Sequence, residues 1–157
     1  MTLTQEPSRR VLVISLLVAI ALQTVPLPNV LATLRPPIVL LVVLFWSVVA
    51  PRLGGIAIAF VAGIAMDVFH GVVLGQHALA ACIVAYIAIR MHLLLRNQTL
   101  LQQCLFVFAA VFLYEAIVWA IDGWTGHAIA NPWRWLSPVL GAICWPLVAA
   151  IVGRYSR

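Results

Sequence analysis

The sequence has very little charge. Only 8% of its 157 residues are charged, lysine is absent, and aspartate and glutamate together number four. A soluble domain carries roughly 25% charged residues, so this chain could not cover a water-facing surface. Hydrophobic residues make up 65% of the chain, and the mean hydropathy is +1.13. The composition therefore excludes a soluble globular protein and predicts a single integral membrane domain over residues 1–157.

Cysteine and catalytic motifs are equally sparse. Cys82, Cys104 and Cys144 lie in apolar segments without CxxC or Cys/His spacing, as expected of buried small hydrophobic residues. The histidines lack a facing pair at helical spacing, so no metal site is expected. The sequence contains no HExxH motif, nucleophile elbow or phosphate-binding glycine loop. It therefore predicts no enzyme activity and no cofactor.

The basic balance of the chain comes from arginine alone. The formal net charge is +5 and the pI is about 9.9. In a soluble protein this balance would suggest nucleic acid, but here the arginines lie in short segments between apolar runs. The positive-inside rule explains this placement better, so no nucleic-acid partner is expected.

Six apolar spans can be drawn, which predicts an all-α, polytopic membrane protein. They cover roughly residues 11–26, 37–50, 53–70, 76–95, 100–121 and 135–152. Pro51-Arg52 and the glycine pair that follows divide the second span from the third. Only the short segment 71–75 separates the third from the fourth, so five spans is the alternative.

Arginine placement distinguishes the two alternatives. With the N-terminus in the cytoplasm, six spans leave only Arg35 and Arg134 outside. The arginines that then lie inside are Arg9, Arg10, Arg52, Arg90, Arg96, Arg154 and Arg157. This excess follows the positive-inside rule, and merging two spans would remove it. The sequence therefore predicts six spans with both termini in the cytoplasm.

The most unusual residue is Asp67, an acid inside an apolar run. Gly63 lies four residues before it, and Gly71 and Gly75 lie four and eight residues after it. At 3.6 residues per turn, this spacing places Gly63, Asp67 and Gly71 on one helix face, which Gly75 continues if the helix extends so far. A carboxylate in a membrane costs several kcal/mol unless it meets a partner or water. The stripe is therefore expected to form a groove against which another segment packs.

The predicted topology brings Asp67 level with other polar side chains. Asp67 lies about 21 Å along the third span at 1.5 Å per residue, in the outer half of the bilayer. Glu115 reaches a similar height in the fifth span, and Arg35 enters the second span from outside. Three interpretations stay open: pairing of Arg35 with Asp67 or Glu115, a groove for a ligand or partner helix, and a proton or ion relay.

The tryptophans divide into two groups. Aromatic rings prefer the headgroup region, which predicts interfacial anchors at Trp124, Trp133 and Trp135. Trp46, Trp119 and Trp145 lie deeper in the spans and are expected to be packing residues. The proline after Trp145 should kink the last span.

In order and spacing, these features resemble the MreD family of rod shape-determining proteins. The matching elements are Arg35-Pro36 before an apolar span to Trp46, Pro51-Arg52, the series Gly63, Asp67, Gly71 and Gly75, Ala85-Tyr86, Gln102-Gln103 and Trp145-Pro146. The resemblance covers nearly the whole length. The second proline, Pro37, departs from the family's pattern.

The resemblance implies a place in the bacterial cytoplasmic (inner) membrane, in the elongation machinery that builds lateral peptidoglycan in rod-shaped cells. It implies MreC, with one membrane helix and a periplasmic domain, as the direct partner. MreB, RodA and PBP2 are implied as indirect partners. The family's fold is similar to the six-helix substrate-binding component of ECF-type vitamin transporters, which is an analogy of fold and not of ligand.

Two functions are therefore expected as alternatives. The first is a non-enzymatic scaffold, in which the outer groove near Arg35, Asp67, Gly71 and Gly75 binds the MreC helix and its juxtamembrane segment. The second is a small-molecule- or lipid-binding membrane subunit of a vitamin-uptake-type transporter, with the same outer cavity as its binding site.

Overall fold

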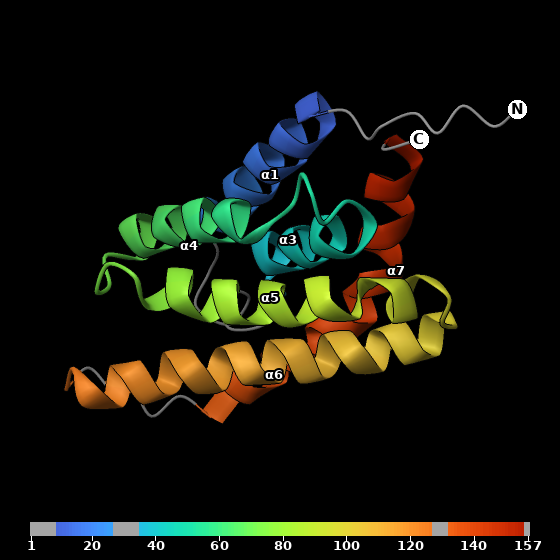
Figure 1. The fold of residues 1–157 in the computed structure, drawn as a ribbon. Helices are drawn as coiled ribbons and strands as arrows, with labels where there is room; N and C mark the ends of the chain where they lie inside the picture. The colour runs from blue at the N-terminus through green and yellow to red at the C-terminus, as the bar shows by residue number, and fades with distance from the viewer. Residues whose placement is uncertain (1–8, 27–34, 127–131, 156–157) are drawn as a thin grey trace, which may run out of the picture.

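The structure is a computed structural model that describes residues 9–26, 35–126 and 132–155, and these residues form helices without strands. Arg157, expected on the cytoplasmic side, lies outside them. In chain order the elements are α1 (Arg9–Thr24), α3 (Ile38–Val49), α4 (Ile56–His70), α5 (Gln76–Arg96), α6 (Leu100–Trp124), the 3-10 helix η1 (Pro132–Leu136) and α7 (Ser137–Tyr155). Figure 1 shows their arrangement as a helical bundle.

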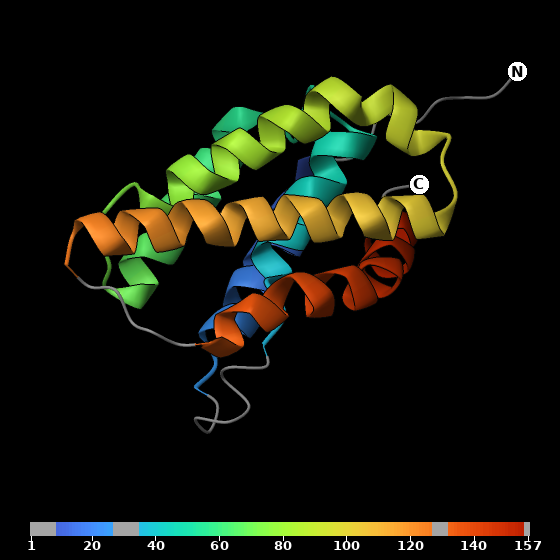
Figure 2. The same cartoon turned by 90° about the horizontal axis from the view of Figure 1, so that it is seen from below.

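Helix α3 forms the centre of the bundle. Its sequence is apolar all round, and almost every residue from Val39 to Val48 is buried, as expected of a helix without a polar face. It packs against α1, α5 and α7. The indole N–H of Trp46 donates to Ser15 Oγ of α1 at 3.0 Å, which satisfies a polar atom of a nearly fully buried side chain. Figure 2 shows α6 flanked by α5 and α7 on the outside of the bundle.

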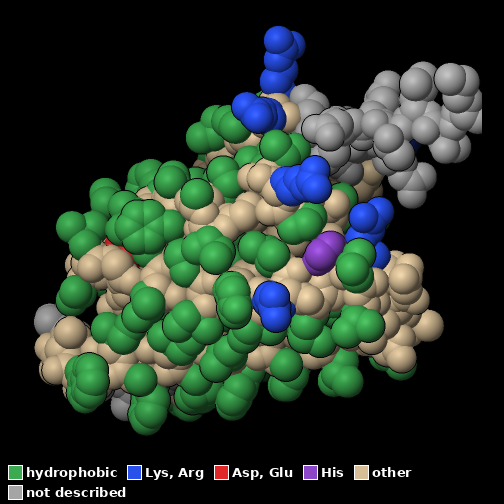
Figure 3. Space-filling view, viewed as in Figure 1, with side chains coloured by type: hydrophobic (Ala, Val, Ile, Leu, Met, Phe, Trp, Pro, Cys, Tyr) green, Lys and Arg blue, Asp and Glu red, His purple; other side chains and the backbone are tan. Residues whose placement is uncertain are grey.

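The outer surface of the bundle is apolar. Leu101 and Leu105 of α6 are 81% and 69% exposed, and α1, α5 and α7 also expose large aliphatic side chains. In Figure 3, hydrophobic side chains are spread over the whole visible face, and the few arginine side chains lie in its upper and right-hand parts and near its centre. Three helices of the described residues are long and apolar enough to cross a membrane, namely Gln76–Arg96, Leu100–Trp124 and Pro132–Arg154, whereas α3 and α4 are shorter apolar helices. An apolar exterior of this kind suits a lipid surround.

Each of the six predicted spans corresponds to one helix of the described chain. The weakest predicted boundary, between the third and fourth spans, is a real turn that separates α4 from α5. Within the last span, Pro146 lies inside α7, and Figure 1 shows α7 changing direction along its length. The predicted kink at this proline fits the bend, because proline removes a helical hydrogen bond.

Candidate functional site: a charged cavity at one end of the bundle

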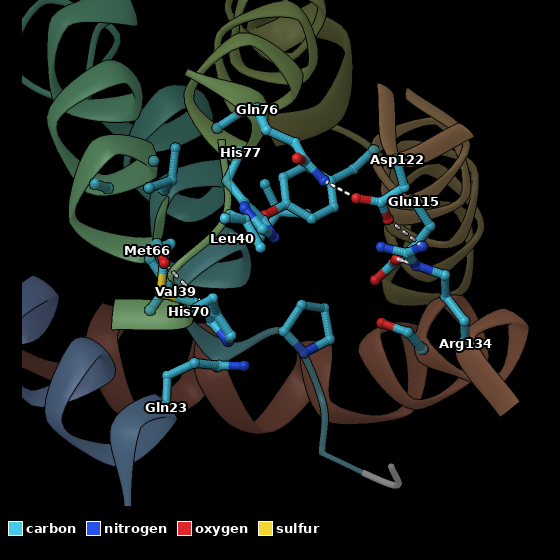
Figure 4. Close-up of a pocket in the computed structure, with 18 of the residues that line it drawn as sticks. Gln23, Val39, Leu40, Met66, His70, Gln76, His77, Glu115, Asp122 and Arg134 are labelled. Carbon is cyan, nitrogen blue, oxygen red and sulfur yellow. Dashed lines mark hydrogen bonds and ion pairs between the residues drawn. The ribbon is translucent and has the colours of Figure 1, made fainter. Parts of the chain in front are cut away.

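A cavity of about 760 Å³ opens at one end of the bundle, where α1 ends, α3 begins, and α4 turns into α5. The far end of α6 and the start of α7 close the other side. Figure 4 shows its side chains converging from these elements. Its polar lining consists of Gln23, Arg35, His70, Gln76, His77, Tyr114, Glu115, Asp122, Thr125, Arg134 and Ser137. In a chain with so few polar residues, this concentration marks the candidate functional site.

Asp67 lies behind the cavity wall, with no exposed surface. One carboxylate oxygen accepts the backbone N–H of Gly75 at 2.7 Å. The other accepts the backbone N–H of His77 and its ring Nδ1–H, both at 2.8 Å. Three donors from the next segment of chain therefore converge on one buried acid. Through these hydrogen bonds, Asp67 holds the turn 71–75 and the start of α5 against the end of α4.

The predicted stripe is correct for Gly63 and Asp67, which both lie in α4, and wrong for Gly71 and Gly75. Helix α4 ends at His70, and Gly71 is its C-cap in the left-handed conformation, with φ 63°. Gly75 precedes α5 and is also left-handed, with φ 99°. Left-handed backbone favours glycine, so these two residues reverse the chain and do not extend a helix face. The second half of the expected stripe is therefore a helix end and a turn.

Gly63 has a different role from the other two glycines. A Cβ at this position would lie 2.2 Å from Ala78 Cα and 2.5 Å from Ala78 N. Such distances are possible only without a side chain, so Gly63 lets α4 and α5 lie in close contact. The sequence predicts a close helix contact at this glycine. The contact is between α4 and α5 of the same chain and not with another protein.

The carboxylates of α6 form an ion cluster with Arg134 of η1. Arg134 Nε donates to Glu115 at 2.9 Å, and its Nη1 donates to Asp122 at 2.7 Å. The side-chain amide of Gln76 donates to the second oxygen of Asp122. Two helices and η1 are joined in this way, and a charge-assisted pair of this kind is stronger than a neutral hydrogen bond.

The expected pairing of Arg35 with Asp67 or Glu115 is wrong. Arg35 donates to the backbone carbonyls of Gln23 and Val25, at the end of α1. The three salt bridges of the described residues do not include it. A cation at a helix C-terminus satisfies carbonyls that have no helical partner, so Arg35 caps the C-terminus of α1. Intramembrane charges are paired here as expected, but with other partners.

Two histidine rings lie against each other at the cavity. His70 and His77 are stacked, with 5.4 Å between ring centroids. The Nδ1 of His70 lies 2.8 Å from the carbonyl oxygen of Met66, and that of His77 lies against Asp67. Within the described residues no group of three or more His, Cys, Asp or Glu side chains could hold a metal ion. The rings therefore contribute hydrogen-bonding capacity to the cavity wall.

The structure brings together most of the residues proposed from sequence. Arg35, Gly63, Gly71 and Glu115 line the cavity, while Asp67 and Gly75 lie just behind its wall. Sequence reasoning did not identify the lining residues Gln23, Gln76 and Tyr114. These residues have one sequence feature in common that could have identified them: each is a polar side chain in the outer half of a predicted span.

The predicted anchor tryptophans are exposed near this end of the bundle. Trp124 is 95% exposed, and Trp133 and Trp135 are also exposed, which suits the anchoring role predicted for them. Trp46 and Trp145 are buried, as predicted. Trp119 differs, because half of its surface is exposed, and its ring lies 6.4 Å from that of Trp135. An exposed ring beside an anchor ring is not a core residue.

Fold and site together define a helical membrane protein with a charged cavity at one end of the bundle. The chain belongs to the MreD family: the family model described as rod shape-determining protein MreD matches residues 7–154. It is also similar to the rod shape-determining protein MreD of Haemophilus influenzae, with 29% identity over 144 residues, 89% of this chain and 86% of the relative. No solved structure matches. The chain therefore has a role related to cell shape, in a family not known for enzymes.

Proposed function

We propose that this protein is a non-enzymatic scaffold of the bacterial elongation machinery in the cytoplasmic membrane. It binds the membrane helix and juxtamembrane segment of MreC and, through MreC, acts with MreB, RodA and PBP2 in lateral peptidoglycan synthesis. Six helices cross the bilayer, with both termini in the cytoplasm. The arginine bias supports this topology, because among the described arginines only Arg35 and Arg134 line the cavity.

The turn 71–75 carries this proposal. Asp67 is fully buried and holds the turn through Gly75 and His77. The turn exposes Val73 and Leu74, the latter by 67%. A charge inside the membrane is costly and marks a functional site, so the apolar turn that Asp67 shapes is a candidate partner surface.

The surroundings of the turn match the partner's chemistry. Val68 and Phe69 on the last turn of α4 are 64% and 59% exposed, so the apolar surface continues from the helix onto the turn. The polar cavity begins directly beside it, at His70 and Gly71. A membrane helix with a polar juxtamembrane segment would contact the apolar surface with one part and the cavity rim with the other.

Co-purification with MreC tests the proposal. Leu74→Asp changes only an exposed side chain, and we expect it to reduce the recovered MreC about tenfold and to round the cells. Leu101→Asp is the matched control, since Leu101 is 81% exposed at the opposite end of the bundle. Gly71→Leu, which is strained at φ 63°, should act like Leu74→Asp, whereas Gly123→Leu should not, because a Cβ at Gly123 meets nothing within 4 Å. Normal MreC recovery with Leu74→Asp would refute the proposal.

A further inference from the structure

The charges around the cavity are divided between two walls. On the α6 side, Glu115 and Asp122 share the single guanidinium of Arg134, so this wall has one negative charge in excess. On the α1 side, Arg35 is bound to backbone carbonyls, and no described carboxylate pairs with it. Figure 4 shows Gln23, the neighbour of Arg35, and Glu115 on opposite sides of the cavity. The cavity therefore has a negative wall and a positive wall.

Each wall also presents polar atoms that the described residues leave unused. Only Oε2 of Glu115 is bonded to Arg134, and neither Oε1 nor the Tyr114 hydroxyl has a hydrogen-bond partner in residues 9–26, 35–126 and 132–155. On the other wall, Gln23 accepts the N–H of Ile38 with its oxygen, and its amide nitrogen has no acceptor in the same residues.

These unused atoms face the cavity. In the described part of the chain, every fully buried side-chain nitrogen or oxygen atom has a partner. Glu115, Tyr114 and Gln23 all line the cavity, so their unpaired atoms are open to its interior. The negative wall offers two acceptors, Glu115 Oε1 and the Tyr114 hydroxyl. The positive wall offers the Gln23 amide donor beside the Arg35 charge.

We propose that this cavity binds a zwitterion made of a primary ammonium and a phosphate, the chemistry of phosphoethanolamine. The ammonium donates to Glu115 Oε1 and the Tyr114 hydroxyl, and the phosphate lies against Arg35 and the Gln23 amide. A volume of about 760 Å³ accommodates such a group with part of what it is attached to. The source is either the headgroup of phosphatidylethanolamine or a soluble phosphoethanolamine. The groups that bind it, on Glu115, Tyr114, Gln23 and Arg35, are different from Leu74, the exposed turn residue that tests MreC binding, although Gly71, Val72 and Val73 of the turn also line the cavity.

Three substitutions test the two walls while keeping the side-chain oxygens that accept the described hydrogen bonds of Glu115 and Gln23. Tyr114→Phe deletes a hydroxyl that has no partner among the described residues, and should weaken binding about 2- to 10-fold. Glu115→Gln removes the charge that receives the ammonium and should weaken binding roughly 10- to 100-fold. Gln23→Glu keeps the acceptor for Ile38 and places a negative charge against the phosphate. Matched controls are Tyr86→Phe on the exposed surface of α5, and Gln98→Glu, exposed at the opposite end of the bundle.

The measurement uses the full chain in two arms. In the first, the protein is released from phosphatidylglycerol nanodiscs that contain equal amounts of phosphatidylethanolamine and phosphatidylcholine, and native mass spectrometry records which lipid stays bound. Phosphatidylcholine is the discriminating probe, because its quaternary ammonium has no N–H donor. In the second arm, O-phosphoethanolamine is titrated against the thermal unfolding of the protein in detergent, with inorganic phosphate as the comparison.

We expect selective retention of phosphatidylethanolamine if a lipid is the source, or stabilisation by O-phosphoethanolamine above that by phosphate if the source is soluble. In either arm the three cavity variants should weaken the signal, Tyr114→Phe least, and the two controls should keep it. Equal retention of both lipids together with no stabilisation by O-phosphoethanolamine would overturn the proposal. A signal that is as strong in all three cavity variants as in the wild-type protein would also overturn it. MreC recovery measured on the same preparations separates failure of this site from failure of the scaffold function.

Discussion

Replacing Asp67 by asparagine should release the turn 71–75 while leaving the helices in place. The asparagine oxygen can still accept the backbone and ring N–H groups of His77, which lie 2.8 Å from one carboxylate oxygen of Asp67. The new amide nitrogen then points at the backbone N–H of Gly75, which lies 2.7 Å from the other oxygen. Two donors would face each other there, so the Gly75 N–H would lose its partner.

The size of the effect follows from this single lost contact. A hydrogen bond to a charged group contributes about 1.5–3 kcal/mol. If the lost contact weakens only the turn, the local opening free energy falls by that amount, and amide exchange in the segment 71–77 accelerates roughly 10- to 150-fold. Amides in the middle of α5, which no contact of Asp67 reaches, should exchange at the wild-type rate.

Hydrogen–deuterium exchange with mass spectrometry on the protein in nanodiscs measures this change directly. Glu115→Gln serves as the matched carboxylate-to-amide control, because Glu115 contacts Arg134 and not the turn. The reasoning is refuted if Asp67→Asn leaves exchange in the segment 71–77 unchanged, or if Glu115→Gln accelerates it equally.

Two further changes test the packing and the ion cluster. Gly63→Ala should force α4 and α5 apart and lower the unfolding temperature by several degrees, because its Cβ would lie 2.2 Å from Ala78 Cα. Gly123→Ala should keep or raise that temperature, since alanine favours a helix by about 1 kcal/mol and meets no neighbour; the reverse order would contradict the packing argument. Arg134→Gln should destabilise the protein by about 1–3 kcal/mol, since two carboxylates lose their cation, and an unchanged melting curve would show that the cluster does not hold α6 to η1.

The helices were predictable because apolar runs broken by proline, glycine and arginine leave few alternatives in a membrane. Helix α3 illustrates this, since its apolar run, ended by Pro51-Arg52, was predicted as a span, and its lack of a polar face suits the central position that it occupies. The turn 71–75 was less predictable. Spacing by four residues is the same for glycines on one helix face and for glycines that end one helix and begin the next. Only the backbone angles of Gly71 and Gly75 distinguish the two cases.

The partners of the charges could not be read from the sequence. The sequence places Arg35, Glu115 and Arg134 at one level, but which of them meet depends on how α1, α6 and η1 are arranged around the cavity. Arg35 donates a hydrogen bond to the carbonyl of Gln23, which lies twelve residues earlier in the chain. The sequence does not specify that these two residues meet. The grouping of these polar residues was therefore predictable, and the ion pairs and hydrogen bonds between them were not.

The central claim is that the apolar surface of the turn 71–75 meets MreC in the membrane. The most direct measurement is photocrosslinking in living cells with a photoreactive amino acid in place of Leu74, compared with the same amino acid in place of Leu101. The account predicts a crosslink to MreC from position 74 and none from position 101. A crosslink to MreC from position 101 and none from position 74 would contradict it.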